Sequence, residues 1–329
     1  MAGLILGSLI FVYTIQSFGG FAKLFSNLKE LKYFYLFVLG NSFLWMLLYT
    51  QAWRFLITDV KNKVRYLSLL KIKMTGEGVN FMTPLGFMAG DPVRVLLLKK
   101  YVSPEARLRS VVIDRLMHTL SAQVFCLSGI LLIFTQDIAF PIALHIGILA
   151  LYSALCVFFV VLIITMITGR GFGVFEGVFK ILKVSQRFPR LDSTLNDLRL
   201  SLEYYKNKSW APFILAFFCH LSGRFLGAVE IMIVFYCYEG HADFIFSMIL
   251  VSLSSLVSIT MGWIPGALGA LEYVYAQFFM LYGFSSDVGV SVQIVRRLRV
   301  FFWIGMGILL LDYAEIGRFF ERFKKKPGS

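Results

Sequence analysis

The chain has 329 residues and a net charge of +13, 58% of its residues are hydrophobic, and its mean hydropathy is +0.75. Apolar runs of roughly twenty residues exclude a soluble globule with one ordinary core and predict a polytopic membrane protein. The excess positive charge is expected from the loops on one side of a membrane, so it does not indicate a nucleic-acid partner.

Inside lipid, every backbone polar group must find a partner within the protein, and continuous apolar runs favour helices over the alternating strands of a barrel. We therefore expect an all-α fold, with residues 1–329 as one membrane domain. The run Leu4–Phe18 lacks the basic start and the small-residue cleavage site of a signal peptide, so it is interpreted as a retained helix. The six predicted spanning helices lie near 3–18, 33–57, 108–134, 139–168, 210–238 and 289–312.

Two further segments, near 66–98 and 242–283, are apolar but interrupted. The first break, Gly76–Arg94, and the second, Ile264–Glu272, each place helix breakers and a carboxylate between two apolar arms, as the paired broken helices of transporters do. The arms of the first segment hold roughly fifteen residues, whereas a full crossing needs about twenty. The first segment is therefore predicted to be a re-entrant hairpin from the cytoplasmic side. The second is predicted to be a hairpin from the outer side, with two full crossings as the alternative.

Each predicted hairpin falls between two spanning helices, and the two hairpins enter from opposite sides. This order predicts an inverted repeat, with one half-repeat at 33–134 and the other at 210–312. Two independent glycine and proline kinks in a large helical bundle are the alternative.

Lysine and arginine gather in the loops on one side of the predicted helices, while the opposite loops are nearly bare. The positive-inside rule places the basic side, with both termini, in the cytoplasm of a cell membrane. The loop 169–208 is expected to lie on the cytoplasmic surface as amphipathic helix against anionic lipid, and 313–329 is a basic tail. The segment Gly19–Lys32, outside the predicted helices, carries three lysines and departs from the rule.

Ionisable residues at membrane depth cost about 2.5–3.5 kcal/mol on insertion scales, so each one indicates a paired or functional role. At the first break the candidates are Glu77, Asn80, Pro84 and Arg94. Asp91 precedes a proline in the order that opens a helix, so it is interpreted as a structural cap.

The second break predicts a site made by backbone groups. Pro265 sets a helix start, and Gly266 and Gly269 leave the neighbouring amides uncovered. This pattern suits either an anion site at the positive end of a helix or close helix packing, and both readings stay open. Glu272 follows within two turns and, when buried, needs a cationic partner or a proton.

Charged residues inside the predicted spanning helices supply further candidates. Asp114, Arg115 and His118 begin the helix 108–134, where Asp114 and His118 are one turn apart and suited to a local polar pair. Arg224 and Glu230 lie deep in the helix 210–238.

Two arginines of the helix 289–312, Arg296 and Arg299, share one face. Arginine holds phosphate in a bidentate fork, so this face is the best side-chain candidate for an anionic headgroup. Snorkelling of both arginines to the outer headgroups is the alternative.

Motifs for soluble enzyme chemistry are absent from the sequence. The chain contains no Gly-x-Ser-x-Gly, no glycine-rich phosphate loop with lysine, and no histidine or cysteine cluster. We therefore expect no enzyme activity, no metal and no cofactor. An intramembrane transferase that uses Glu77 or Glu272 as a base is the remaining enzymatic reading.

Several of these residues follow one another in a characteristic order and spacing: Glu77, Asn80, Pro84, Gly90, Arg94, Asp114-Arg115, Arg224 and Pro265-Gly266-x-x-Gly269-x-x-Glu272. In this series, which extends over most of the chain, the protein resembles the lysylphosphatidylglycerol synthase transmembrane-region family, also called flippase-like domain or UPF0104 proteins. It departs from the family's pattern at Gly86–Asp91, where a double glycine is usual, and at Asp114, where glutamate is more frequent.

The resemblance implies a stand-alone member, without the cytoplasmic synthase domain of larger relatives. Such a protein is expected to move an anionic or phosphate-bearing lipid headgroup between the leaflets of the cytoplasmic membrane. Arg224, Arg296 and Arg299 would hold the headgroup in a polar cavity between the hairpins, lined or gated by Glu77 and Glu272. Expected partners are membrane lipids, anionic phospholipid above all, and a separate lipid synthase or glycosyltransferase. A non-transporting lipid-binding or accessory subunit is the alternative.

Overall fold

The protein is all helical over the residues that this computed structural model describes, which confirms the predicted fold class. Outside the described residues lie Pro84, the loop 169–208, the tail 313–329 and most of the predicted helix 139–168, of which Ile146–Val157 is described and helical. The described residues are 2–57, 64–82, 90–136, 146–157, 159, 210–261 and 264–310.

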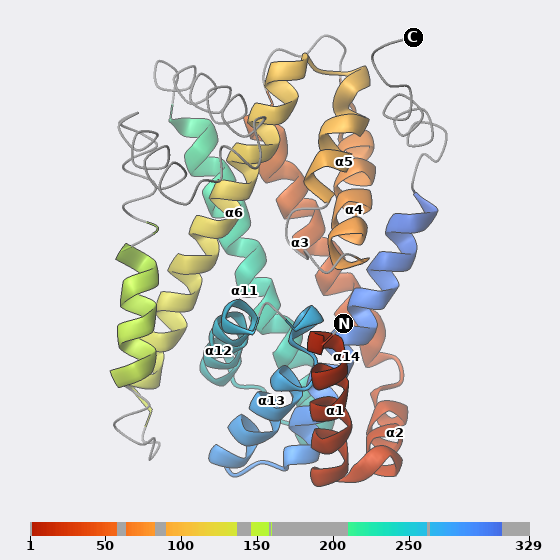
Figure 1. Cartoon of the computed structure of the whole chain (residues 1–329), viewed down its shortest axis with the longest axis vertical. Helices are drawn as coiled ribbons and strands as arrows, with labels where there is room; N and C mark the ends of the chain where they lie inside the picture. The colour runs from red at the N-terminus through yellow and green to blue at the C-terminus, as the bar shows by residue number, and fades with distance from the viewer. Residues whose placement is uncertain are drawn as a thin grey trace.

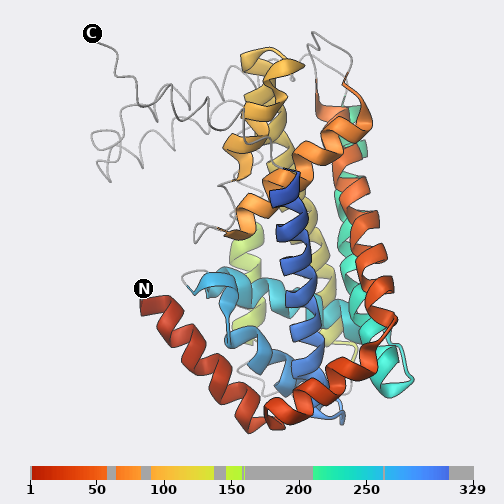
Figure 2. The ribbon, with the colours of Figure 1, turned by 90° about the vertical axis from the view of Figure 1, so that its right-hand side faces the viewer.

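The N-terminal segment is a bent pair of helices, α1 (Ala2–Ser17) and α2 (Gly20–Leu31), with an angle of 80° between them. Gly19 and Gly20 form the bend with φ values of 107° and 73°, which residues with side chains rarely adopt. Figure 2 shows α1 descending from mid-height to the base of the molecule, where α2 begins.

The segment Gly19–Lys32 was expected to lie outside the helices. This expectation was wrong, because Gly20–Leu31 forms the helix α2. The segment is amphipathic: Leu24 and Leu31 are buried, while the lysines lie at the surface. Its basic residues lower the average hydrophobicity, so the apolar face was not recognised. The side-chain amide of Asn27 donates to Asp287 at 2.9 Å and so ties α2 to α14 (Ser286–Leu309).

The first half of the chain continues with four α-helices and a short 3-10 turn. Ser103 caps α6, because its hydroxyl accepts from the amide of Ala106 at 3.4 Å and Pro104 occupies the first turn. The interrupted segment near 66–98 is confirmed as two helices. The elements are α3 (Phe34–Leu56), α4 (Tyr66–Met82), α5 (Gly90–Leu97), η1 (Leu98–Lys100) and α6 (Pro104–Ile133).

The second half repeats this order of a long helix, two short helices and a long helix. Gly240 ends α11 with a φ of 64°, and the carboxylate of Asp243 caps α12 by accepting from the amide of Phe246 at 3.0 Å. The interrupted segment near 242–283 is thus also confirmed as two helices. The elements are α11 (Ala211–Glu239), α12 (Phe244–Thr260), η2 (Pro265–Ala267), α13 (Ala270–Leu281) and α14.

The two pairs of short helices lie at opposite ends of the molecule. Figure 1 shows α4 and α5 in the upper half, next to the start of α6, and α12 and α13 in the lower half, below the middle of α11. The long helices α3 and α11 pack against each other, and the amide of Asn41 donates to the carbonyl of Leu226 at 2.8 Å across them. An aromatic core of Phe235, Phe246 and Phe279, with ring centroids 4.9 to 5.3 Å apart, holds the lower half together.

Length and apolar character mark α6 and α11 as candidate membrane spans, and the bent pair α1 and α2 as a third. With 16 residues, α1 alone reaches about 24 Å at 1.5 Å per residue, which is short for the hydrocarbon layer. The count of six spanning helices and the position of both termini stay predictions.

Each half also packs its first short helix against the last long helix of the other half, and small residues permit both contacts. Where α4 crosses α14, a Cβ added to Gly307 would lie 3.0 Å from the Cα of Gly78. Where α12 crosses α6, a Cβ added to Gly129 would lie 2.0 Å from the hydroxyl of Ser252. The two crossings depend on glycines, because the lack of a side chain lets the helices approach closely, as is common for helix contacts in membranes.

We expect Gly307→Ala to destabilise the protein by about 1–3 kcal/mol, because the new methyl group forces α4 and α14 apart. Gly305→Ala is the matched control, since a Cβ at Gly305 meets nothing within 4 Å. Thermal unfolding of the purified protein in detergent measures the difference. A Gly307→Ala variant that melts at or above the Gly305→Ala variant would contradict the proposed crossing.

Candidate functional site

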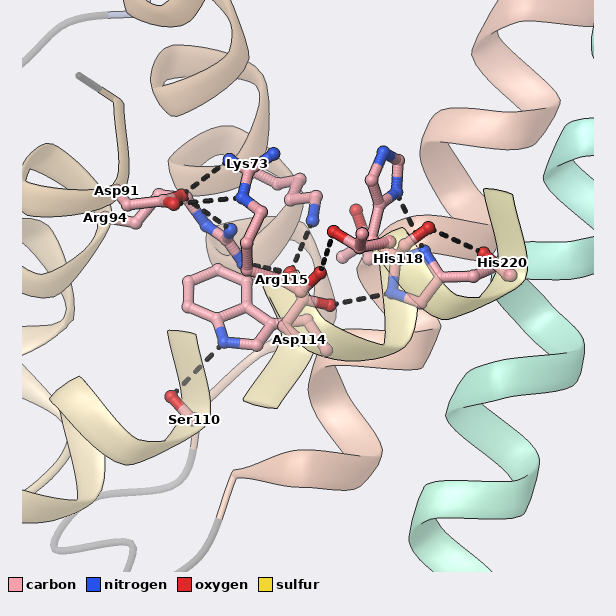
Figure 3. Close-up of polar contacts among 12 residues, drawn as sticks. Lys73, Asp91, Arg94, Ser110, Asp114, Arg115, His118 and His220 are labelled. Atoms are coloured by element: carbon pink, nitrogen blue, oxygen red, sulfur yellow. Dashed lines mark hydrogen bonds and ion pairs between the residues drawn. The ribbon is translucent and has the colours of Figure 1, made fainter. Parts of the chain in front are cut away.

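A buried carboxylate, that of Asp114, joins four helices. Asp114 lies in α6 and is 1% exposed. Its Oδ2 accepts from Nζ of Lys73 in α4 at 2.7 Å and from a guanidinium nitrogen of Arg94 in α5 at 2.6 Å, and its Oδ1 contacts Nε2 of His220 in α11 at 3.0 Å. Figure 3 shows these side chains converging. A carboxylate buried this deeply needs such cationic and hydrogen-bonding partners.

A second carboxylate, Asp91, extends the network toward the surface. It lies in the first turn of α5 and accepts two hydrogen bonds from Arg115, at 2.8 and 3.0 Å, and one from Arg94 at 3.2 Å. The bidentate contact fixes the guanidinium plane of Arg115 (Figure 3). The predicted role of Asp91 as a helix cap stays a prediction, and its arginine pairs are an additional role.

Glycines of the first break let α4 and α5 approach around Arg94. A Cβ on Gly76 would lie 2.5 Å from Cγ of Arg94, and a Cβ on Gly90 would lie 1.8 Å from the carbonyl oxygen of Gly76. The amide of Gly90 donates to Asn80 at 2.7 Å, and the side-chain amide of Asn80 donates to Glu77 at 3.3 Å. Glu77, Asn80 and Arg94, three of the candidates from the first break, therefore lie together.

An aromatic side chain covers the other face of Arg94. The ring centroid of Trp53 lies 4.1 Å from the guanidinium carbon, and the indole N–H donates to the hydroxyl of Ser110 at 3.2 Å (Figure 3). Because Arg94 and Trp53 are both 0% exposed, this cation–π contact is fully shielded from solvent.

Two histidines continue the network between α6 and α11. Nδ1 of His118 lies 3.3 Å from Nδ1 of His220, and a guanidinium nitrogen of Arg224 lies 2.6 Å from Nε2 of His118. Asp114 and His118 were expected to form a local pair within α6. Instead, His220 of the facing helix α11 lies between them and contacts both side chains. We call Lys73, Glu77, Asp91, Arg94, Asp114, Arg115, His118, His220 and Arg224 the Asp114 cluster.

The other candidate arginines gather around Glu230 of α11, which is 0% exposed. Arg299 donates to its carboxylate at 2.6 Å, and Arg296 lies 3.6 Å from the other carboxylate oxygen. Arg296 also donates to the hydroxyl of Tyr275, and Arg299 stacks on Trp45 with 4.5 Å between its guanidinium carbon and the ring centroid. The predicted shared face of Arg296 and Arg299 is thus directed at one carboxylate of the protein itself.

Glu272 is the acid of the second break and is 0% exposed. Its cationic partner is Arg297, which donates to both carboxylate oxygens. The same carboxylate accepts from the amide of Gly269 at 2.7 Å and so caps α13. The amide of Gly269, which the sequence suggested was uncovered, is therefore satisfied internally.

Gly266 keeps the exposed backbone of the second break. It follows Pro265, which opens η2, and its φ of 60° lies in a region that favours glycine. We call Glu230, Glu272, Tyr275, Arg296, Arg297 and Arg299 the Glu230 cluster.

The charges in the two clusters do not balance. The Asp114 cluster contains the cations Lys73, Arg94, Arg115 and Arg224 and the carboxylates of Glu77, Asp91 and Asp114. In the Glu230 cluster, Arg296, Arg297 and Arg299 face Glu230 and Glu272. With both histidines neutral, each cluster has one cation more than it has carboxylates. Within the described ranges, no group of three histidine, cysteine or carboxylate side chains is arranged to hold a metal ion.

Sequence reasoning missed Lys73, His220, Trp53 and Trp45, and it required a cationic partner or a proton for Glu272 without selecting one. The spacing of residues along a helix could have identified Lys73 and His220. Lys73 stands four residues before Glu77, and His220 four residues before Arg224, so each shares a helix face with a residue that was selected.

Removal of the central charge tests the Asp114 cluster. We expect Asp114→Asn to cost about 3–5 kcal/mol, because buried Lys73 then loses its carboxylate partner and buried Arg94 keeps only Asp91. Asp91→Asn is the control and is expected to cost less, because the Asp91 side chain is 16% exposed and solvent screens the charges around it. Thermal unfolding in detergent gives both values, and equal losses would contradict the central role of Asp114.

The chain was compared with known proteins. The family described as Lysylphosphatidylglycerol synthase TM region matches residues 1–307. A UPF0104 membrane protein of Methanothermobacter thermautotrophicus is 25% identical over 289 residues, which cover 82% of each chain. A UPF0104 membrane protein of Pyrococcus horikoshii is 21% identical over 296 residues, which cover 82% of this chain and 84% of the relative. No solved structure matches the chain.

Proposed function

The chain belongs to the Lysylphosphatidylglycerol synthase TM region family, and from this premise we propose that it is a lipid translocase. In this proposal it moves an anionic or phosphate-bearing headgroup between the leaflets of the cytoplasmic membrane, while the acyl tails stay in lipid. Membrane lipids are its partners, and a separate lipid synthase or glycosyltransferase supplies or uses the lipid. The protein itself makes and breaks no covalent bond.

The excess cation in each buried cluster is the observation that carries the proposal. An isolated buried charge is costly, and a phosphodiester headgroup brings one negative charge that offsets it. Arginine suits this ligand because its planar fork binds two phosphate oxygens. Arg224 is the candidate in the Asp114 cluster, since its described contacts are to His118 and to no carboxylate. In the Glu230 cluster, Arg296 and Arg299 share Glu230 and leave part of their charge available.

An inverted repeat gives the two clusters equivalent places in the transport cycle. The two pairs of short helices lie at opposite ends of the molecule (Figure 1), and each pair packs its first helix on the last long helix of the other half. This arrangement supports a rocking motion that exposes one cluster and then the other. Glu77 and Glu272, one at each break, are the proposed gating residues.

A non-transporting lipid-binding or accessory role is the second candidate. It is favoured by the internal pairing of the four carboxylates Asp91, Asp114, Glu230 and Glu272, since paired networks hold helices in one arrangement. The two candidates differ in whether headgroups cross the bilayer.

Reconstitution into liposomes tests the proposal. We expect the protein to accelerate the transfer of fluorescent phosphatidylglycerol between leaflets, measured as loss of fluorescence to an external quencher. Arg224→Gln is expected to slow transfer by about tenfold or more, because a hydrogen bond to a charged group contributes about 1.5–3 kcal/mol.

Arg54→Gln is the matched control, since Arg54 lies in the last turn of α3 at the exposed surface and contacts the ring of Tyr66. Its transfer rate should equal that of the unaltered protein. Transfer no faster than in empty vesicles, across several classes of phospholipid, would refute the translocase and leave the accessory role.

A further inference from the structure

We propose that His118 takes up a proton when a phosphate group binds Arg224, so that the Asp114 cluster receives the anion and the proton together. The ligand is a phosphate monoanion of a lipid headgroup, and the inference rests on the translocase function proposed above. It adds a coupling ion to that function.

Arg224 is linked to Asp114 through His118 and His220. The chemistry of these groups determines the donor and the acceptor of each hydrogen bond in this chain. Guanidinium groups only donate, so Nε2 of His118, 2.6 Å from Arg224, accepts and carries no proton. Neutral His118 then carries its proton on Nδ1 and donates it to Nδ1 of His220 at 3.3 Å. His220 therefore carries its proton on Nε2 and donates to Oδ1 of Asp114 at 3.0 Å. Every nitrogen in this chain has one role, and both imidazoles are neutral.

This directed chain has no place for a further proton. A proton on Nε2 of His118 would oppose the donor of Arg224, and a proton on Nδ1 of His220 would oppose the donor of His118. Protonation of His118 therefore requires Arg224 to leave Nε2. A phosphate group that draws the Arg224 guanidinium to its own oxygens provides that step.

The groups around His118 make the two events dependent on each other. The guanidinium of Arg224 lies against the ring of His118, so a proton on the ring would add a second positive charge beside it and is opposed until an anion arrives. Tyr49 of α3 presents its ring to His118 at 5.1 Å and brings no negative charge. The titratable and charged groups that face His118 are Tyr49 from α3, Lys73 from α4, Asp114 and Arg115 from its own helix, and His220 and Arg224 from α11.

The charge and the atoms both balance in this step. A hydronium ion gives its proton to Nε2 of His118 and leaves a water molecule, and no group is oxidised or reduced. The bond from Arg224 to His118 breaks, and bonds from Arg224 and from protonated His118 to phosphate oxygens form. The anion offsets the single excess positive charge of the cluster, and the proton on His118 then adds one positive charge, so the anion and the proton together bring no net charge.

Titration calorimetry of the full-length protein in detergent tests the inference, with dihexanoyl phosphatidylglycerol as the probe. Binding is measured at one pH in two buffers of different ionisation enthalpy, because the difference in heat gives the number of protons taken up. We expect uptake approaching one proton for each lipid. We also expect the Kd to rise by about tenfold for each pH unit over the range in which His118 is neutral in the free protein and protonated in the complex.

The matched variant is His118→Gln, whose side-chain carbonyl accepts from Arg224 while its amide donates to His220, so the chain of hydrogen bonds is kept and the titrating group is lost. It should unfold at the temperature of the unaltered protein, bind the probe without buffer-dependent heat, and show a Kd that is independent of pH. Proton uptake that persists in this variant would overturn the role of His118.

Other outcomes separate the inference from the function on which it rests. If liposome transfer and lipid binding occur without proton uptake, the coupling is refuted and the translocase stands. If neither binding nor transfer occurs, both fail. The same titration is repeated with glycerophosphoglycerol and with inorganic phosphate, two probes that have no acyl chains. If either binds as tightly as the lipid with the same proton uptake, the coupled site is supported and the lipid headgroup is refuted as its source.

Discussion

The arrangement of the first half depends on the burial of one carboxylate, Asp114, among partners from three other helices. A carboxylate without partners in such surroundings would cost several kcal/mol, so Lys73, Arg94 and His220 must all reach it. This requirement sets the depth of α4, the start of α5 and the rotation of α11 relative to α6. The glycines of the first break then have a physical role, because side chains at Gly76 and Gly90 would prevent α5 from delivering Arg94.

The second half meets the same requirement with different residues. Glu272 caps its own helix through Gly269 and takes Arg297 from α14, while Glu230 of α11 takes Arg299 and Arg296. In both halves a broken helix supplies part of a charged network that the neighbouring long helices complete. The helix α11 contributes to both networks, since His220 and Arg224 join the first cluster and Glu230 joins the second. A rotation of α11 would therefore affect both at once.

Sequence reasoning recovered the elements whose signal is local. The long apolar runs gave the long helices, and glycine and proline gave both breaks, because each signal depends on neighbouring residues. It also selected Glu77, Asn80, Arg94 and Glu272, since a charged or polar side chain in an apolar segment stands out. It could not assign partners, because Lys73 and Asp114 meet only after α4 and α6 pack. The face of Arg296 and Arg299 was correctly found, but its contact with Glu230 depends on the rotation of α11, which no local pattern sets.

The two clusters share an excess positive charge but differ in what can change it. The Glu230 cluster is built from arginines, glutamates and Tyr275, and none of these side chains ordinarily changes its charge near neutral pH. The Asp114 cluster contains two imidazoles, which ordinarily titrate there. A cycle that exposed the clusters in turn would thus let one of them respond to the proton concentration on its side of the membrane, while the other binds its anion at fixed charge. Such a difference between the halves of a repeat would give transport a preferred direction whenever a proton gradient is present.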